Sequence, residues 1–151
     1  MSNREEFYPM RFFATLTVDD LEASTRWYTD VLGFRLVFSM TGQDGAPILS
    51  HLRWIKYADL LLAPQGPPTS SKTDKGMGVR LSFLVTEGTV DELADKVKAR
   101  DCTIAQGPLT QPWNTREFTV LDPDGYTLTF FQQADTNRTF DQVVQDVSQK
   151  V

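Results

Sequence analysis

Side chains that ligate metals or act as nucleophiles are scarce in this sequence of 151 residues, which holds one histidine, His51, and one cysteine, Cys102. Sites for zinc, iron, nickel or copper usually take several imidazole or thiolate ligands, so a metal here would be held mostly by carboxylates. No nucleophile elbow, glycine-rich phosphate loop or paired-carboxylate site is present. Metal catalysis is therefore disfavoured and no cofactor is expected. We expect Cys102 to be buried and inert, and His51 to lie on the surface or on an edge strand, with a position lining a ligand cleft as the alternative.

The charge balance indicates which partners the protein can have. Fifteen basic and 20 acidic side chains give a formal net charge of -5, whereas nucleic-acid binding needs clustered lysine and arginine. The acidic balance favours a cationic ligand instead. No apolar stretch approaches the 18 residues of a membrane span, and the first ten residues contain no apolar run of the kind found in secretion signals. We expect a cytoplasmic protein with no nucleic-acid and no membrane partner.

Hydrophobic periodicity predicts the elements that position these residues. Residues 12–18 alternate as a strand, Asp19 or Asp20 caps a helix that Gly33 ends, and three strands follow at 34–40, 48–55 and 60–63. The pattern then repeats. It predicts a strand at 79–85, a helix capped by Thr89 and ending at Arg100, and strands at 102–105, 116–121 and 126–132, with a hairpin turn at 122–125.

The two halves of this pattern agree at an offset of 67 residues, which places Phe13 with Arg80 and Leu16 with Phe83. This duplication predicts a single α+β domain of tandem βαβββ modules, one at about 10–64 and the other at about 79–133. A linker loop rich in Pro, Gly, Ser and Thr is expected at 65–78. The tail 135–151 is expected to form a helix, and its apolar stripe must pack on this chain's sheet or on a partner's.

Strand alternation divides the side chains between two faces. The face expected to line a cleft is hydroxyl-rich: Phe13, Thr15, Thr17, Arg80, Ser82, Glu117, Thr119, Thr127, Thr129 and Phe131. The face expected to lie under the helices is apolar: Leu16, Val18, Phe83, Val85, Phe118 and Val120. Arg116 and Glu117 are neighbours on a strand and therefore point to opposite faces, but the sequence does not decide which of them enters the cleft.

Two motifs resemble a known family. Residues 18–34, VDDLEASTRWYTDVLGF, are similar to the strand-to-helix opening of the vicinal oxygen chelate superfamily, which includes glyoxalase I, extradiol dioxygenases and bleomycin resistance proteins. Residues 111–126, QPWNTREFTVLDPDGY, resemble its closing hairpin, in the form closest to the bleomycin resistance branch. The resemblance covers residues 11–132. It implies two modules whose sheets curl around a shared cleft, usually completed in a homodimer.

Some members of this superfamily bind a divalent ion in that cleft, and their ligand positions can be compared with this sequence. They fall on Phe13, Arg80 and Thr129, with a fourth near Leu60, and none of these is His, Asp or Glu. A benzyl ring cannot coordinate a cation, and a guanidinium repels one. Glyoxalase or dioxygenase activity needs the metal. The resemblance therefore implies the bleomycin resistance branch, whose members give antibiotic resistance by sequestering a drug without turnover.

We therefore expect a metal-independent protein that binds a planar or cationic antibiotic or metabolite, such as a glycopeptide or aromatic antibiotic, in a homodimer cleft. The expected ligand-binding residues are Phe13, Thr15, Phe38, Trp54, Arg80, Ser82, Trp113, Glu117 and Thr129. The alternative is a metal-dependent lyase or dioxygenase with non-standard ligands. A third possibility is an interaction module whose cleft is filled by its own Phe13 and Trp54.

Single residues keep alternatives of their own. Arg80 either pairs with Glu117 in place of the lost metal or binds an anionic or carbonyl group of a ligand. Trp113 is either an aromatic wall or a packing anchor, and the same choice holds for Trp54 and Phe38. Trp27 and Tyr28 lie at helical spacing and are assigned to the core.

Overall fold

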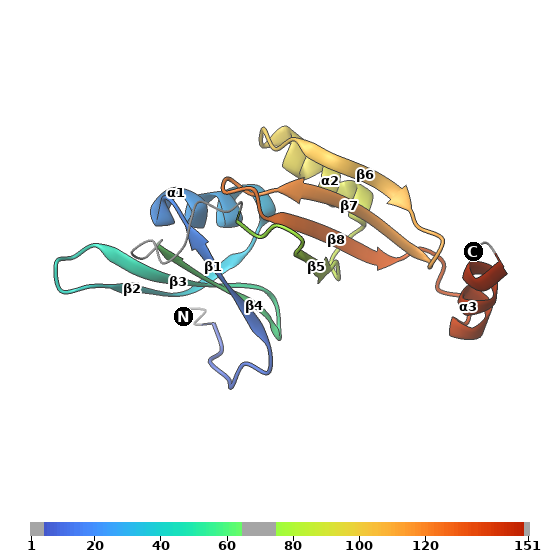
Figure 1. Ribbon diagram of the computed structural model, residues 1–151, viewed down its shortest axis with the longest axis horizontal. Helices are drawn as coiled ribbons and strands as arrows, with labels where there is room; N and C mark the ends of the chain where they lie inside the picture. The colour runs from blue at the N-terminus through green and yellow to red at the C-terminus, as the bar shows by residue number, and fades with distance from the viewer. Residues whose placement is uncertain (1–4, 65–74, 150–151) are drawn as a thin grey trace. The chain divides into compact units, whose positions relative to one another are not determined.

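The computed structural model describes residues 5–64 and 75–149, which divide into two compact units (Figure 1). Unit 1 comprises the chain up to Met77 together with the turn 122–125, and unit 2 comprises the remainder. The elements of unit 1 are β1 (Phe13–Val18), α1 (Leu21–Arg26), η1 (Trp27–Leu32), β2 (Arg35–Thr41), β3 (Pro47–Ile55) and β4 (Ala58–Pro64). Those of unit 2 are β5 (Arg80–Leu84), α2 (Val90–Ala99), β6 (Ile104–Thr110), β7 (Thr115–Leu121), β8 (Thr127–Gln133) and α3 (Phe140–Gln149).

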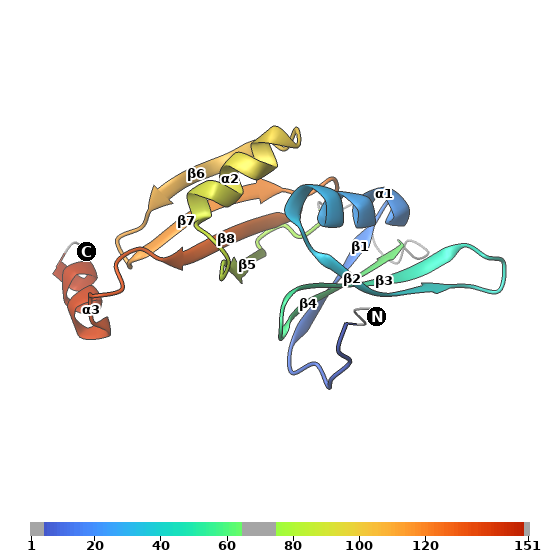
Figure 2. The ribbon, with the colours of Figure 1, turned by 180° about the vertical axis from the view of Figure 1, so that it is seen from behind.

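Each unit contains a four-stranded sheet of the same topology. The strand order is β1-β4-β3-β2 in unit 1 and β5-β8-β7-β6 in unit 2. The first strand of each unit pairs in parallel with the last, and the other pairs are antiparallel. One helix covers one face of each sheet, α1 in unit 1 and α2 in unit 2 (Figure 2). This arrangement confirms the predicted α+β fold of tandem βαβββ modules.

The core of unit 1 lies between its sheet and its helix. The Asp20 carboxylate accepts a hydrogen bond from the Ala23 amide, so Asp20 is the N-cap, and Gly33 ends the helix with φ +92°. The sequence predicts one continuous helix here, but its second half is a π-helix, η1. The wider turn places the Tyr28 and Leu32 side chains in the core, where both are almost completely buried. Trp27 is only half-buried, so the core assignment is confirmed for Tyr28 alone.

The core of unit 2 is built from three phenylalanine rings under α2. Phe130 stacks between Phe83 and Phe118, with ring centroids 5.6 and 5.4 Å apart. Thr89 is the N-cap of α2, as predicted, and accepts a hydrogen bond from the Glu92 amide. The predicted apolar face is therefore confirmed as the face that packs under the helix. Cys102 is also buried, and burial raises the pKa of its thiol, as expected for an inert cysteine.

The remaining boundaries differ in part from the predicted ones. Helix α3 covers 140–149, whereas the sequence predicts 135–151, and residues 150–151 lie outside the described part of the chain. Residues 65–74 of the predicted linker also lie outside it. No helix in the described ranges is long and apolar enough to cross a membrane.

The turn 122–125 packs within unit 1 through its carboxylates. Within the turn, the Asp124 amide donates to the Asp122 carboxylate. Asp122 also accepts a hydrogen bond from the Tyr28 hydroxyl at 2.7 Å, and Asp124 accepts one from the Lys75 ammonium at 2.7 Å. Tyr28 and Asp122 are both buried. A buried carboxylate depends on its donors because water cannot replace them.

Removing the Tyr28 hydroxyl is therefore expected to destabilise the fold. Tyr28→Phe keeps the ring in the core but takes one donor from Asp122, so the free energy of unfolding should fall by about 1–3 kcal/mol. Urea denaturation followed by circular dichroism measures the change. Tyr57→Phe is the control, because Tyr57 is exposed. Equal stability of the two variants would contradict the importance of the buried hydrogen bond.

Gly107 lies at a close approach between β6 and β7. Its φ is +87°, and a Cβ atom there would lie 2.6 Å from the Glu117 carbonyl oxygen. Gly45 has a similar φ of +80° but open space around the Cβ position. An alanine at Gly45 would therefore meet backbone strain alone, whereas an alanine at Gly107 would meet backbone strain and steric overlap together.

Alanine substitution at these two glycines should have different costs. Gly45→Ala is expected to lower the free energy of unfolding by about 1–2 kcal/mol, which is the cost of a left-handed alanine. Gly107→Ala should cost a further 1–3 kcal/mol or so, because β6 and β7 must separate to admit the methyl group. Thermal unfolding of both variants tests this, and equal losses would show that the strands give way freely.

Candidate ligand-binding site

The face of the unit 2 sheet opposite α2, called here the open face of unit 2, carries the predicted polar row. Arg80 pairs with Thr127 and Ser82 with Thr129 between β5 and β8. Glu117 lies opposite Phe131 between β7 and β8. The register therefore answers the question that the sequence left open. Glu117 lies on the open face, whereas Arg116 forms an ion pair with Asp91 of α2 at 2.8 Å.

Most polar groups on this face are already hydrogen-bonded within the chain. The Thr119 and Thr129 hydroxyls share a hydrogen bond of 2.7 Å, and Thr129 is only 2% exposed. Glu117 accepts hydrogen bonds of 3.0 Å from Gln111 and Thr115. Arg80 and Ser82 are exposed, and within the described residues Arg80 has no ion pair. The Arg80–Glu117 ion pair considered from the sequence is thus not formed.

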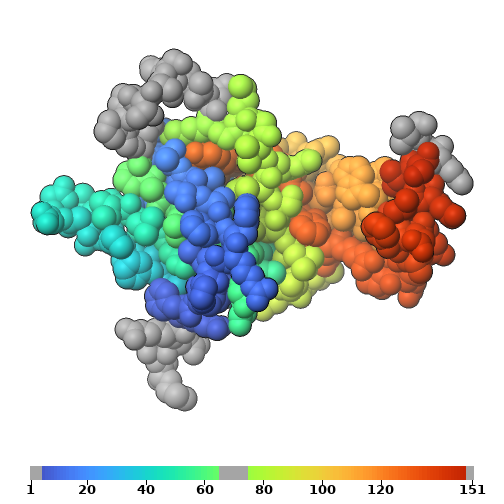
Figure 3. Space-filling model, turned by 60° about the horizontal axis from the view of Figure 1, so that its bottom comes forward, coloured from blue at the N-terminus to red at the C-terminus, as the bar shows by residue number. Residues whose placement is uncertain are grey.

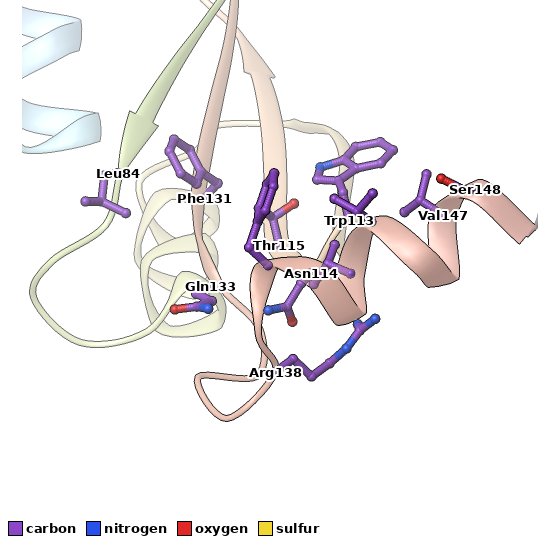
Figure 4. Close-up of a pocket in the computed structure, with 12 residues that line it drawn as sticks. Leu84, Trp113, Asn114, Thr115, Phe131, Gln133, Arg138, Val147 and Ser148 are labelled. Carbon is purple, nitrogen blue, oxygen red and sulfur yellow. The ribbon is translucent and has the colours of Figure 1, made fainter.

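A pocket of about 500 Å³ opens where this face meets α3 (Figure 4). The sheet contributes Leu84 and Phe131, and the loop before β7 contributes Trp113. Helix α3 contributes its apolar stripe. The complete lining is Leu84, Trp113, Asn114, Thr115, Phe131, Gln133, Arg138, Phe140, Val143, Val144, Val147 and Ser148. Trp113 is the one predicted binding residue among them. Phe131 was expected on the cleft face, and the predicted apolar stripe supplies Phe140, Val143, Val144 and Val147, whereas the sequence did not indicate the remaining lining residues.

The loop that carries Trp113 is held in place by backbone hydrogen bonds. The Gln111 amide donates to the Thr115 carbonyl, and the Asn114 amide donates to the Gln111 carbonyl. Asn114 is buried with a φ of +71°. The turn leaves the Trp113 side chain 50% exposed at the pocket. A half-exposed indole on a fixed loop is available for stacking, so the geometry favours the aromatic-wall alternative over the packing anchor.

The charge inside the pocket differs from the charge of the whole chain. Among the described residues, its lining contains no carboxylate, and its one charged side chain is Arg138, which is paired with Asp146. The Asp146 carboxylate that pairs with Arg138 is itself outside the lining. The charge of the whole chain therefore does not set the ligand preference of this pocket.

The open face of the unit 1 sheet, opposite α1, carries a polar cluster that we call the Asp59 cluster. It consists of the buried His51, Arg53 and Asp59 and the half-buried Tyr8. The Asp59 carboxylate accepts hydrogen bonds from the Tyr8 hydroxyl at 2.7 Å and from Arg53 at 3.0 to 3.2 Å, and it lies 2.7 Å from His51 Nε2. Arg53 also donates to the Glu6 carbonyl at 2.7 Å and stacks on the Tyr8 ring. The N-terminal segment thus closes this cluster from above the sheet.

His51 is 8% exposed on the interior strand β3, so the expected surface or edge-strand position is wrong. The reason is that Asp59 and Arg53 provide a polar environment inside the unit. The position near Leu60 also changes, because Leu60 itself is in the core and its neighbour Asp59 lies on the open face beside Phe13. Across the described ranges, no three His, Cys, Asp or Glu side chains are grouped to hold a metal ion.

Burial by itself would raise the pKa of Asp59, but hydrogen bonds from Arg53, His51 and Tyr8 outweigh it and lower the pKa below its ordinary value of 3.8. A carboxyl group with a depressed pKa in the folded state stabilises the fold fully above its unfolded pKa, and this contribution is lost as the pH falls through the folded value. The free energy of unfolding should therefore decline below pH 3.8. Asp59→Asn should remove this part of the acid dependence, and an unchanged profile in urea titrations at several pH values would contradict it.

The other predicted binding residues are dispersed. Phe13 and Thr15 are exposed on the open face of unit 1. Phe38, opposite His51, packs edge-to-face on Phe7 at a second pocket, of about 490 Å³. Trp54 packs against Phe34, which is in the core, with ring centroids 5.3 Å apart. The structure thus groups Arg80, Ser82, Glu117 and Thr129 on one face and places Trp113 at the pocket, while Phe13, Thr15, Phe38 and Trp54 belong to unit 1.

The fold and the sequence place the chain in a known class of protein. The family model of the Glyoxalase/Bleomycin resistance protein/Dioxygenase superfamily matches residues 12–130, and the chain belongs to this superfamily. The resemblance seen in the two sequence motifs is thereby confirmed.

Individual relatives agree with this assignment. The bleomycin resistance protein of Geobacillus stearothermophilus is 28% identical over 125 residues, covering 78% of this chain and 92% of the relative. The crystal structure of TioX from Micromonospora sp. ML1 matches with a TM-score of 0.65 and 22% identity, over 80% of this chain and 96% of that one. TnmS3, an antibiotic binding protein from Streptomyces sp. CB03234, matches with a TM-score of 0.63 and 23% identity, over 80% and 93% of the two chains.

Proposed function

We propose that this protein sequesters a planar aromatic small molecule, an antibiotic or a metabolite, in the pocket of unit 2 without changing it chemically. The observation that carries the proposal is the pocket of about 500 Å³ between Trp113, Phe131 and the apolar stripe of α3. Pockets of roughly 300–1,000 Å³ with aromatic walls and few polar groups are typical of sites for drug-sized ligands. The planar shape follows from the exposed indole, which offers a flat stacking surface.

The names of the relatives support the ligand class. One is a bleomycin resistance protein and another is an antibiotic binding protein. The pocket favours an aromatic ligand that is neutral there over a cationic one, because none of the described lining residues carries a carboxylate. We therefore do not propose the cationic ligand that the net charge suggests.

We propose further that binding needs no metal. Phe13, Arg80 and Thr129 occupy the positions at which related proteins are expected to hold the ion. Within the described residues, neither the carboxylate beside Phe13 in unit 1 nor the one on the open face of unit 2 replaces them, because Asp59 is held by Arg53 and Glu117 by Gln111 and Thr115. A divalent ion beside the Arg53 guanidinium would also be repelled. The competing function, a metal-dependent lyase or dioxygenase, would need ligands beyond this set.

We expect the protein to act as a cytoplasmic homodimer, as the resemblance to its superfamily implies. Size-exclusion chromatography with light scattering measures the mass in solution, and a monomer of 17.1 kDa at all concentrations would contradict the expectation.

The proposed function is tested by titrating the dialysed protein with bleomycin, quinoxaline-2-carboxylate and 8-anilinonaphthalene-1-sulfonate. Quenching of tryptophan fluorescence and a higher melting temperature are expected with at least one of them, and the bound compound should be recovered unchanged. Elemental analysis of the same sample should find no stoichiometric Zn, Ni, Mn or Fe. Absence of binding by all three compounds, or a stoichiometric metal, would overturn the proposal.

A further inference from the structure

We propose that helix α3 is a ligand-contacting wall of the pocket and that ligand binding fixes it against the open face of unit 2. This inference rests on the proposed function and deepens it. The family match ends at residue 130, and α3 begins at Phe140, so the helix is an addition to the part of the chain that the superfamily shares. It still contributes much of the pocket lining, from Phe140 to Ser148.

The ends and side chains of α3 favour a helix that forms locally. The Thr139 hydroxyl accepts a hydrogen bond from the Gln142 amide at 3.2 Å, and the Gln142 side chain accepts one from the Thr139 amide at 2.8 Å. These two reciprocal bonds form a capping box. The Arg138 guanidinium also pairs with the Asp146 carboxylate across two turns. A helix of ten residues is nevertheless marginal by itself in water.

The apolar stripe of α3 lacks the packing that would stabilise the helix. Within the described part of the chain, α3 packs extensively against none of the other helices or strands. In Figure 3 its atoms, drawn in red, lie at one end of unit 2. Phe140 is 80% exposed and Val144 is 44% exposed. The stripe faces the pocket, with Phe131 and Trp113 on the other side (Figure 4). A flat ligand filling this space would contact both sides and remove apolar surface from water on each.

Asn114 connects this helix to the wall that carries Trp113. Its side chain donates to the Asp135 carbonyl and accepts from the Asp135 amide, each at 2.9 Å, and its own carbonyl accepts from the Ala134 amide. These three bonds hold the chain just before α3 next to the Trp113 loop. Asn114 is thus a positioning residue, and the space between Trp113 and α3 depends on it.

The choice of occupant follows from the shape and chemistry of this space. It is a concave pocket with an aromatic residue on the sheet and another on the loop, and its volume fits a small molecule. We therefore assign the occupant as an aromatic small molecule. A second copy of the chain is the competing occupant and is distinguished by the experiment.

The experiment uses full-length variants and the probe 8-anilinonaphthalene-1-sulfonate, with quinoxaline-2-carboxylate as a second probe. Val144→Pro breaks α3, Phe140→Ala shortens its stripe, and Gln145→Ala on an exposed position is the matched control. We expect affinity to fall about tenfold or more for Val144→Pro and by several-fold for Phe140→Ala, and to stay unchanged for Gln145→Ala. The melting temperature without probe should stay close to that of the parent, because α3 adds little to the core.

Amide hydrogen exchange gives a second readout. Exchange in residues 140–149 should slow when probe is added to the parent protein. Asn114→Gly, which keeps the left-handed turn but loses the side-chain bonds, should weaken this protection.

Equal affinity of Val144→Pro and the parent would overturn the inference while leaving the proposed function standing. If Val144→Pro abolished a dimer and left probe affinity unchanged, the apolar stripe would instead be the contact surface for a second copy of the chain. Failure of the parent to bind either probe or bleomycin would overturn the inference together with the function on which it rests.

Discussion

Replacing Asp59 with asparagine is expected to lower the free energy of unfolding by about 3–5 kcal/mol, the usual cost of breaking a buried ion pair from one side. The Asp59 side chain is fully buried, and the Arg53 side chain beside it is 3% exposed. Asparagine preserves the shape but removes the negative charge. The guanidinium then stays buried beside the Glu6 carbonyl, the Tyr8 ring and the more distant Glu5 carboxylate, which do not replace the Asp59 charge next to it. Urea denaturation at neutral pH, followed by circular dichroism, measures the loss.

Two further variants make this test specific. Asp95→Asn changes an exposed aspartate of α2 in the same way and should alter stability by no more than about 0.5 kcal/mol. In the double variant Arg53→Met with Asp59→Asn, neither charge is left alone. It should therefore be less destabilised than the sum of its single variants, with a coupling of about 1–3 kcal/mol. Additive effects would show that the two side chains stabilise the fold independently.

Trp113→Ala is expected to weaken the binding of an aromatic ligand by about 10- to 100-fold, with little effect on stability. Truncating an aromatic residue that stacks at the centre of a binding site commonly costs more than 1 kcal/mol and often 2 or more. The indole is 50% exposed, so the fold loses little packing when it is removed. Isothermal titration with 8-anilinonaphthalene-1-sulfonate measures the affinity, and thermal unfolding measures the stability.

The control for this prediction is Trp54→Phe, which changes a tryptophan that packs on Phe34 in unit 1. It should leave ligand affinity unchanged and should preserve the quenching of tryptophan fluorescence, whereas Trp113→Ala should abolish most of that quenching. If Trp54→Phe removed the signal and Trp113→Ala did not, the ligand would bind in unit 1.

Local sequence signals predicted most of the fold. The Asp20 and Thr89 caps, the stop at Gly33 and the period-two strands each act within a few residues, so they are readable without tertiary information. The agreement of the two halves at an offset of 67 residues, which places Leu16 with Phe83, revealed the duplication, and the two sheets indeed share one topology. The π-helical turn at η1 was not predicted, because helical spacing alone does not distinguish a π turn from an α turn over six residues.

The candidate site was harder to predict because it depends on contacts between distant segments. Tyr8 reaches Asp59 across 51 residues, and no local pattern records that contact. One signal was available in the sequence. His51 and Arg53 lie two residues apart, on one face of a strand whose other residues are mostly apolar. Polar side chains in such a strand indicate a buried polar cluster. The stripe of α3 was visible in the sequence, but the surface it faces depends on the turn at Asn114.

The most direct test of the central claim is a crystal structure of the metal-free protein with the compound that most raises its melting temperature among bleomycin, quinoxaline-2-carboxylate and 8-anilinonaphthalene-1-sulfonate. We predict an intact ligand whose aromatic ring lies between Trp113, Phe131 and the stripe of α3. A ligand bound on the open face of unit 1, or one bound through a metal ion, would contradict the claim.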